Sequence, residues 1–438
     1  MSGLQSGSTE RGFKRAGDAG LQDPLFRLPI WHILMGVGLV AGLLAALVCL
    51  AGGPLNRTLH GDSPYYSDLA YSLSSGRGYV LHRSPWPTSP HLGRLPLWPL
   101  LLTPGTRLLP QDDEGLLVRG TGILVHALAA VLMALLTFRI WSNSAAAALA
   151  GVFFGAFPPE LARVSMGDSE PAFCLFASCG LLLLVAPSRR RWVQGCGALL
   201  SGLAVLARSN YLILPFTATI AILLIDPGLF RNWKRMAVLA GLFFLPASAW
   251  VVRNYLVSGE FPLVSALEGE TLYGGNNAVV ATDLDFWGAW IWADRIPGER
   301  PRQELARSMN EAQVNEYYRC NAVRYALDNW RSYPRLIFGK LVRAFVPIPW
   351  NGLDAWAELA LACIRGALYL GFFWCVVRGG VLTKTYAIYL TAILLVTLVT
   401  TVVFYGTIRF TMCLDAYLLP CISVAVVKYF TTRLRRPS

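Results

Sequence analysis

Long apolar runs almost free of charge are the feature that most limits what this chain can fold into. An α-helix needs about 20 predominantly apolar residues to cross a bilayer, and the sequence holds ten runs near that length. They are 30–52, 117–138, 143–158, 170–187, 193–207, 210–226, 236–252, 355–377, 384–404 and 411–430. The sequence therefore predicts an all-α polytopic membrane protein.

A further apolar stretch, 335–350, contains the basic residues Lys340 and Arg343. Charged side chains are costly in the hydrocarbon region of a bilayer. We therefore predict an amphipathic juxtamembrane helix at the outer face, with an additional span as the alternative. The expected total is thus about 10–11 transmembrane helices.

The low share of charged residues argues against a soluble protein. Only 15% of the 438 residues are Asp, Glu, Lys or Arg, whereas a soluble domain carries about 25%. The net charge of +12 could suggest a nucleic-acid partner, but the basic residues lie mostly in short turns between apolar runs. The positive-inside rule explains that placement, so we expect no nucleic acid. The nine cysteines follow no metal-binding spacing.

The basic turns also predict the orientation of the chain in the membrane. With a cytoplasmic N terminus, every short basic turn falls on the cytoplasmic side. These turns and tails hold Arg11, Lys14, Arg27, Arg139, Arg189, Arg190, Arg191, Arg231, Lys234, Arg235, Arg378, Lys384, Lys428, Arg433, Arg435 and Arg436. We expect both ends in the cytoplasm, as a disordered tail, 1–29, and a basic tail, 431–438.

Two long segments then lie on the outer side. The segment 53–116 follows the first run, and 253–334 follows the seventh. They define an N-terminal membrane module, 30–252, which contains the first outer loop, and a C-terminal membrane module, 335–430. The second loop predicts an amphipathic helix at the membrane surface, because apolar residues recur there at helical spacing. These residues are Tyr318, Ala322, Tyr325, Ala326 and Trp330.

Acidic residues near the outer ends of the spans are the first candidates for chemistry. Asp62 lies in the first outer loop, just before the pair Tyr65 and Tyr66. Asp168 and Glu170 lie at the start of the fourth run. Helix capping is the structural alternative for each of these acids. Paired carboxylates beside one cavity could instead supply a general base or hold a divalent cation.

Arginines also gather on the predicted outer side, where the positive-inside rule disfavours them. They are Arg94, Arg208, Arg253 and Arg409. Salt bridges with the outer acids would explain them. Phosphate binding would explain them equally well, because a guanidinium group matches two phosphate oxygens with parallel hydrogen bonds. A site of this kind beside a bilayer suggests a lipid phosphate as substrate.

Several motifs resemble the GT-C superfamily of polytopic glycosyltransferases, in particular the branch with protein O-mannosyltransferases and lipid A aminoarabinose transferases. The first outer loop reads GDSPYYSDLAYSLSSGRGY and then GRLPLWPLLL, like that branch's first-loop signature. The second acidic motif is MGDSEPAF. Later matches are SAWVVRNYLVSGEFPLVSALEGETLYGGNN, CNAVRYALDNWRSYPRLIFGKLVRAF and GTIRF. These matches cover most of the chain in the right order, but they do not identify the sugar or the acceptor.

The resemblance implies an inverting hexosyl- or pentosyltransferase that uses a polyprenyl-phosphate sugar donor. By the family pattern, Asp62 is the base that takes the proton of the acceptor hydroxyl. Arg94 and Arg253 are the first candidates for binding the donor phosphate, followed by Arg208 and Arg409. Either Asp168 or Glu170 is expected to orient the acceptor or a cation. The substrate cavity is expected to include Tyr65, Tyr66, Asn254, Asn276 and Asn277, although a tight turn also explains Gly-Gly-Asn-Asn.

The expected partners are the lipid-linked donor, the bilayer and an acceptor protein, lipid or glycan. No cofactor is required by the motifs. A divalent cation, Mg²⁺ or Mn²⁺, could bind at Asp62, Asp168 or Glu170. We expect a bacterial inner membrane with the active site facing the periplasm. The alternatives are a transporter or lipid flippase, a non-catalytic scaffold, and a lipid-linked phosphate or acyl transferase; a transporter predicts charged residues at mid-membrane.

Overall fold

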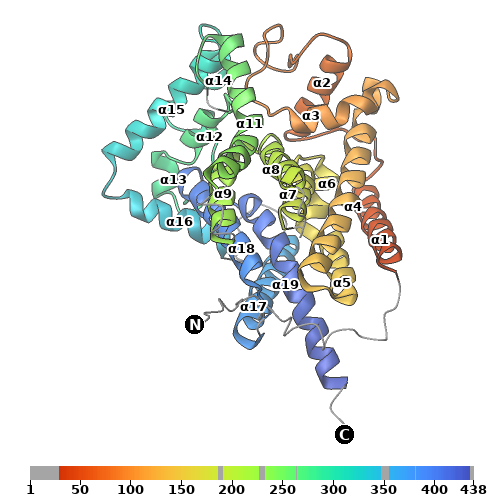
Figure 1. Cartoon of the computed structure of the whole chain (residues 1–438). Coiled ribbons are helices and arrows are strands. Elements are labelled where there is room, and N and C mark those ends of the chain that lie inside the picture. The colour runs from red at the N-terminus through yellow and green to blue at the C-terminus, as the bar shows by residue number, and fades with distance from the viewer. Residues whose placement is uncertain are drawn as a thin grey trace, which may run out of the picture.

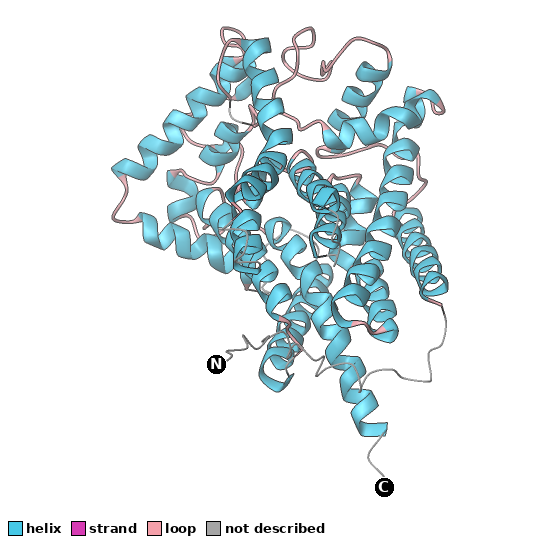
Figure 2. Ribbon diagram, viewed as in Figure 1, coloured by secondary structure: helices cyan, strands magenta, loops and turns pink. Residues whose placement is uncertain are grey.

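The computed structural model describes residues 29–185, 191–225, 232–262, 264–346, 355–379 and 381–434. All regular elements within these ranges are helices, apart from one isolated antiparallel bridge between Val80 and Pro90 (Figure 2). The predicted all-α class is therefore confirmed. Most of the two predicted tails, together with Arg189, Arg190 and Arg231 of the basic turns, lies outside the described residues.

Ten of the described helices coincide with the ten predicted apolar runs. An eleventh helix, α6, begins at the last residue of the run 143–158. The eleven helices are α1 (Ile30–Ala51), α4 (Glu114–Trp141), α5 (Ser144–Gly155), α6 (Pro158–Met166), α7 (Glu170–Val185), α8 (Arg191–Val205), α9 (Leu214–Ile225), α11 (Trp233–Ser258), α17 (Ala355–Gly379), α18 (Lys384–Val403) and α19 (Ile408–Leu434). Shorter elements connect them. They are α2 (Ser63–Ser74), α3 (Leu97–Leu102), η1 (Thr103–Arg107), η2 (Gln111–Asp113), η3 (Ser209–Tyr211), α12 (Glu268–Gly274), α13 (Ala278–Thr282), η4 (Ala293–Arg295), α14 (Arg302–Leu305), α15 (Glu311–Asp328) and α16 (Tyr333–Phe345).

Six of the described helices are long and apolar enough to cross a membrane, namely α1, α4, α11, α17, α18 and α19. The pair α5 and α6 could form a seventh span, bent by 46°. The bend is explained by Pro158 and Pro159, which lie where the chain starts its second helix and cannot continue the first. The helices α7, α8 and α9 have 16, 15 and 12 residues, so they are shorter than a full span of about 20. The chain is an integral membrane protein.

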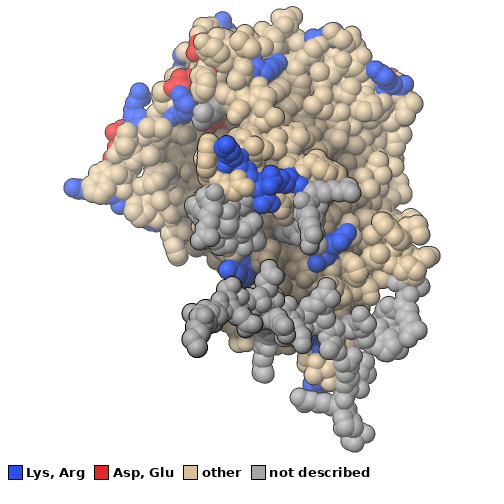
Figure 3. All heavy atoms as spheres, viewed as in Figure 1, with Lys and Arg blue, Asp and Glu red and all other residues tan. Residues whose placement is uncertain are grey.

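The long helices pack side by side through small residues. The helix α4 contacts α1, α5 and α7, and α19 contacts α5, α17 and α18. At the contact of α7 with α8, a Cβ on Gly180 would lie 2.8 Å from the backbone nitrogen of Ser201. Such close approach is typical of membrane helices, which gain packing energy where their backbones meet. The outward face of α1 is apolar, with Leu39, Leu43 and Leu47 exposed, and the right-hand edge of the molecule near α1 shows few charged atoms in Figure 3.

The two predicted outer loops lie at one end of the helix bundle, away from the C terminus (Figure 1). The first loop forms α2 and α3, and the second forms α12 to α15. The predicted surface helix is present as α15, with Tyr318 and Ala322 buried. Trp330 lies beyond the end of α15 and is exposed, so the predicted stripe was one residue too long. These loops cover the ends of the membrane helices and build the site described next.

The stretch predicted as a juxtamembrane helix forms α16, which has 13 residues and is too short to span. Its two basic residues are buried rather than exposed. The ammonium group of Lys340 donates hydrogen bonds to Asn276 Oδ1 at 2.7 Å and to the carbonyl of Val402 at 3.0 Å. Arg343 donates to the carbonyls of Asp285 and Trp287. The segment 347–350 of the predicted stretch lies outside the described residues.

Candidate functional site

A cavity of about 150 Å³ lies where the outer loops meet the ends of the membrane helices. Its wall is built by segments that are far apart in the sequence: the start of α2, the loop stretch 93–95, the turn 207–210, the segment 265–271 and the turn 404–410. Four ionic side chains on this wall were predicted from the sequence. They are Asp62, Arg94, Arg208 and Arg409.

Asp62 occupies the residue before α2, but its side chain makes no capping hydrogen bond to that helix. Its carboxylate instead contacts two arginines, with Oδ1 2.7 Å from Arg94 Nη1 and Oδ2 3.4 Å from Arg409 Nη2. The capping alternative for Asp62 is therefore wrong. The carboxylate is directed toward the guanidinium groups because Ser63, the next residue, is tied to the carbonyl of Met166 by its hydroxyl group.

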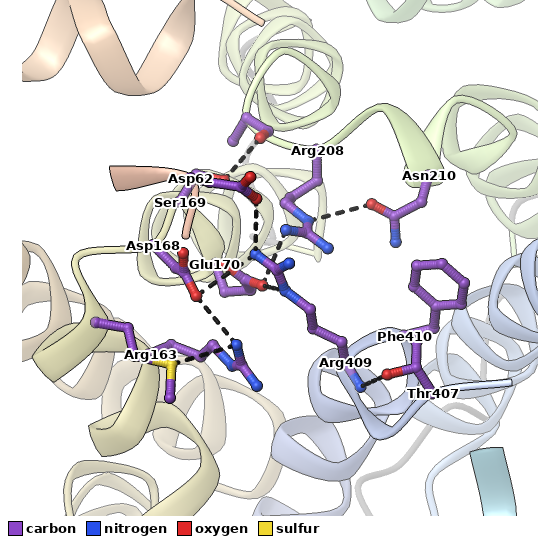
Figure 4. Close-up of polar contacts among 12 residues, drawn as sticks. Asp62, Arg163, Asp168, Ser169, Glu170, Arg208, Asn210, Thr407, Arg409 and Phe410 are labelled. Atoms are coloured by element: carbon purple, nitrogen blue, oxygen red, sulfur yellow. Dashed lines mark hydrogen bonds and ion pairs between the residues drawn. The ribbon is translucent and has the colours of Figure 1, made fainter. Parts of the chain in front are cut away.

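Asp168 and Glu170 both contact Arg409 as well (Figure 4). Glu170 Oε1 accepts from Arg409 Nε at 2.6 Å and from Arg208 Nη1 at 2.9 Å. Asp168 Oδ2 lies 3.0 Å from Arg163 Nη1 and 3.4 Å from Arg409 Nη2. We call the set the ionic cluster; it consists of Asp62, Arg94, Arg163, Asp168, Glu170, Arg208 and Arg409. One arginine of the last span thus joins acids from two distant parts of the chain.

Local backbone geometry explains how the two acids reach Arg409. The helix α6 ends at Gly167, whose φ of +79° lies in the left-handed region that glycine adopts without strain. This turn is fixed by Trp98, whose indole nitrogen donates to the carbonyl of Gly167 at 3.2 Å. The hydroxyl of Ser169 donates to the carbonyl of Ala207 at 3.0 Å, which holds the neighbouring turn with Arg208 beside the acids.

The acids of the cluster lie in two layers. Asp62 lines the cavity, whereas Asp168 and Glu170 lie behind the arginines and are not part of the cavity wall. Glu170 is 1% exposed, and its second oxygen, Oε2, has no hydrogen-bond partner among the described residues. This geometry suits Asp168 and Glu170 to orienting the arginines. The prediction that one of them contacts the acceptor stays a prediction.

Charge interactions set the ionisation of the cluster. Burial alone would raise the pKa of the Asp62 carboxyl, but the charges of Arg94, Arg409 and Arg208 lower it well below its usual value. The pKa of Asp168 is raised by burial and by the nearby charge of Glu170, against the opposing effect of Arg409. The pKa of Arg94 is raised because Asp62 outweighs its burial. Four guanidinium groups therefore face three carboxyl groups, and at least one positive charge is left in excess.

Aromatic side chains line the first outer loop beside Arg94. The guanidinium carbon of Arg94 lies 5.0 Å from the ring centre of Tyr65 and 5.7 Å from that of Tyr66, within the range of cation–π attraction. Tyr66 is part of the cavity wall, and its contact with a substrate stays a prediction. The two rings limit the positions that the Arg94 side chain can take.

Arg253 and Asn254 lie outside this cavity wall. Arg253 donates to the backbone carbonyl of His91 at 2.7 Å, and its guanidinium carbon lies 4.8 Å from the ring centre of Trp250. Asn254 is fully buried, and its amide nitrogen lies 3.4 Å from the carbonyl of Val264. Both residues follow the seventh run, but the sequence could not show to which side of α11 each one points.

Asn276 and Asn277 also lie outside the cavity wall and have structural contacts. Asn277 caps α13, accepting a hydrogen bond from the amide of Val280 at 3.2 Å. The amide nitrogen of Asn276 donates to the carbonyl of Val403 at 3.0 Å. Turn and cap geometry, the alternative stated for these two residues, describes what the structure shows.

Three residues near the cavity were missed by the sequence reasoning. Arg163 was not singled out in the sequence, although it lies only five residues before Asp168, with which it forms an ion pair. Glu268 and Tyr405 line the cavity. Glu268 makes no ion pair within the described residues, and burial raises its pKa to about 7. Tyr405 lies four residues before Arg409, so its place near the cluster could have been inferred from that spacing.

The predicted divalent cation finds no ligand set in this arrangement. Among the described residues, no group of three or more His, Cys, Asp or Glu side chains is placed to hold a metal ion. Asp62, Asp168 and Glu170 each contact at least one guanidinium group. Arg409 lies between the three acids, where a cation bridging them would have to bind. The described residues therefore do not fit a metal site here.

Comparisons with known proteins give a limited likeness. No family model matches the chain, and no curated protein matches it. A crystal structure of ArnT from Cupriavidus metallidurans bound to undecaprenyl phosphate is similar, with 16% sequence identity and a TM-score of 0.44, covering 89% of this chain and 78% of that chain. The apo structure of the same ArnT covers the same shares, with 15% identity and a TM-score of 0.40.

Proposed function

We propose that this protein is a membrane glycosyltransferase that moves a sugar from a polyprenyl-phosphate donor to an acceptor hydroxyl group. The observation that carries the proposal is the ionic cluster at the ends of the membrane helices. Its positive charge is in excess, and three of its four arginines line a cavity. A polyprenyl-phosphate sugar is a phosphodiester with one negative charge, so its charge complements that of the site. The motifs that resemble GT-C enzymes point to the same chemistry.

The donor phosphate would bind Arg94, Arg208 and Arg409, which share the cavity wall. A guanidinium group can give two parallel hydrogen bonds to a phosphate. When the bond between the sugar and the phosphate oxygen breaks, the leaving lipid phosphate gains a second negative charge. Fixed positive charges aimed at that oxygen stabilise the transition state more than the bound donor, and this difference accelerates the reaction.

Asp62 would act as the general base. Its carboxylate is ionised at neutral pH, but the arginines beside it lower its pKa and make it a weak base while no donor is bound. The acceptor oxygen forms a bond to the anomeric carbon as the bond to the phosphate oxygen breaks, and the hydroxyl proton passes to Asp62. A single displacement of this kind inverts the anomeric centre. A donor phosphate bound to Arg94 and Arg409 would weaken the ion pairs that these arginines form with Asp62, and the Asp62 carboxylate would become a stronger base.

Sidedness follows from the charge distribution in the sequence. Both long loops lie at the end of the bundle away from the C-terminal end of α19 (Figure 1), and residues of both loops line the cavity. If the short basic turns face the cytoplasm, the cavity faces the other side. We therefore place the active site at the periplasmic face of a bacterial inner membrane, where the lipid part of the donor stays in the bilayer.

The transporter alternative predicts charged residues within the membrane, and Arg365 of α17 and Asp415 of α19 form such a pair at 3.1 Å. The pair is supported by its surroundings, since Arg365 also donates to Thr411 and to the carbonyl of Ala344. Tyr369 donates to the second oxygen of Asp415 at 2.9 Å. A buried pair with this many hydrogen bonds is suited to holding two helices together, so the transferase is the better supported function.

The test is sugar transfer by the purified protein in liposomes. A panel of radiolabelled undecaprenyl-phosphate sugars is supplied with an acceptor membrane extract, and Asp62→Asn is compared with wild type. Asp294→Asn is the matched control, because Asp294 is an exposed outer-loop aspartate in η4. We expect transfer by wild type and the control, and a loss of at least about 100-fold for Asp62→Asn. Equal transfer by all three proteins would remove Asp62 from the reaction.

A further inference from the structure

The backbone of Arg94 is held at both of its polar atoms. His91 Nε2 lies 2.8 Å from the backbone nitrogen of Arg94 and accepts its hydrogen bond. The hydroxyl of Tyr79 donates to the backbone carbonyl of Arg94 at 3.0 Å. His91 is only 4% exposed, so water does not compete readily for these contacts. A side chain that binds phosphate is thereby fixed through its own main chain.

The contact with Arg94 determines where the proton on His91 must be. Because Nε2 accepts a hydrogen bond, it carries the lone pair, and the ring proton of the neutral imidazole is on Nδ1. Nδ1 lies 3.1 Å from Glu311 Oε1 of α15, close enough for a charge contact although the ring is not aligned for a full hydrogen bond. The other oxygen, Glu311 Oε2, accepts from the amide of Leu92 at 2.8 Å. Glu311 therefore contacts both the imidazole ring of His91 and the backbone amide of Leu92, close to Arg94 in the chain.

Arg253 of α11 supports the same segment from another direction. Its guanidinium group donates to the backbone carbonyl of His91 at 2.7 Å and lies over the rings of Tyr79 and Trp250. Arg302 lies 3.2 Å from Glu311 Oε1 and fixes that carboxylate in turn. The charged groups around His91 are thus Glu311, Arg302, Arg253 and the side chain of Arg94.

We propose that Glu311 and His91 form a positioning pair that holds Arg94 in place for the donor phosphate and so links the second outer loop to the site. The proposal rests on the function proposed above, because it assumes that Arg94 binds a lipid phosphate. His91 performs this role only as the neutral tautomer. A second proton, on Nε2, would direct N–H against the N–H of Arg94 and release the main chain.

The surroundings of His91 favour the neutral ring. Burial lowers its pKa, against the opposing charge of Glu311, while Arg94 and Arg302 lower it further. Since the folded-state pKa lies below the unfolded one, the contact is complete near neutral pH and is lost as the pH falls through the folded-state pKa. We therefore expect donor binding to weaken on acidification because His91 becomes charged.

Two substitutions separate positioning from simple packing. In His91→Gln, the side-chain amide oxygen can occupy the position of His91 Nε2 and still accept the hydrogen bond from the backbone N–H of Arg94. The shorter side chain of His91→Asn reaches only the place of Nδ1, so the contact with Arg94 is lost. Both remove the aromatic ring, so a merely structural role predicts the same effect for both. Each variant is checked by thermal unfolding, in which we expect similar losses.

The measurement is direct binding of radiolabelled undecaprenyl phosphate to the purified protein in nanodiscs, from pH 5 to 8, with undecaprenol as the uncharged control. At pH 7.5 we expect His91→Gln to bind within about 3-fold of wild type and His91→Asn to bind about 10-fold more weakly, the loss of one well-made hydrogen bond. Acidification should weaken binding less in His91→Gln than in wild type. Some weakening remains in both, because protonation of the phosphomonoester itself, at about pH 6, affects both proteins equally.

Equal affinities for the two variants, or an unchanged pH profile in His91→Gln, would overturn the positioning pair while leaving the proposed function intact. A wild-type protein that binds the lipid phosphate no better than undecaprenol would instead overturn the proposed function and this proposal with it. The two failures are therefore distinguishable in one experiment.

Discussion

Arg409 is the residue whose replacement should disturb this protein most. It contacts Asp62, Asp168 and Glu170, two of which are almost fully buried. Arg409→Ala leaves Glu170 with Arg208 as its ion-pair partner and removes the link to Asp62. Breaking a buried ion pair from one side typically costs about 3–5 kcal/mol. Because Arg208 and Arg163 still neutralise two of the acids, we expect about 3 kcal/mol, the lower end of that range.

The assay is equilibrium unfolding of the purified protein in mixed micelles, followed by tryptophan fluorescence. Arg319→Ala is the control, because Arg319 is an exposed arginine whose contact with Glu316 lies at the surface of α15; we expect it to change stability by less than about 0.5 kcal/mol. Glu170→Gln alone and Arg409→Ala with Glu170→Gln complete a double-mutant cycle. Because the two side chains contact each other, the double variant should lose at least about 1 kcal/mol less than the sum of the two single losses.

The reasoning is refuted if Arg409→Ala is no more destabilising than Arg319→Ala. It is also refuted if the two single losses add up in the double variant, because the loss would then not come from the contact between Arg409 and Glu170. Arg409→Lys gives a finer check. Lysine keeps the positive charge but lacks the planar guanidinium group, whose several N–H donors contact Glu170 and the two aspartates together. We therefore expect a stability between those of wild type and Arg409→Ala.

Three other predictions concern the cavity. Arg208→Lys should raise the donor KM by about 10-fold, measured in the liposome transfer assay, because a single ammonium cannot contact Glu170 and the phosphate in the same way. Glu268→Gln should stabilise the protein at pH 8 more than at pH 5. The pKa of Glu268 is raised in the folded protein, so its ionisation opposes folding as the pH rises toward 7. Thermal unfolding of the variant and the wild type at the two pH values checks this. Arg253→Ala should raise the donor KM less than Arg94→Ala does, because Arg253 lies outside the cavity wall; equal effects in the transfer assay would contradict its placement.

The sequence was sufficient for the helical architecture because hydrophobic length is a strong local signal. It was less reliable for the number of spans. The run 143–158 corresponds to α5 and the start of α6, because Pro158 and Pro159 begin a new helix in place of a longer one. The run 210–226 corresponds to only 12 residues of α9. Composition shows that a segment is apolar, but tertiary packing decides where a helix begins and ends.

For the site, residue type and position in the loops identified most of the ionic cluster, because charges at the outer ends of spans are unexpected. The pairing could not be predicted, since Asp62 and Arg409 are 347 residues apart. The sequence could not show that Arg253 lies outside the cavity wall, because a residue on α11 can point either to the cavity or to the neighbouring loop. His91 gave no signal at all, since a lone histidine in a loop has no pattern that links it to Arg94.

The contact between Arg409 and the acids has a consequence for how the protein is made. Asp62, Asp168 and Glu170 are synthesised early, whereas Arg409 belongs to α19, the last helix of the described chain. During synthesis these acids remain without this partner until α19 has been made. A chain arrested before α19 therefore has three arginines facing three carboxyl groups, and it lacks the excess positive charge that a phosphate would need.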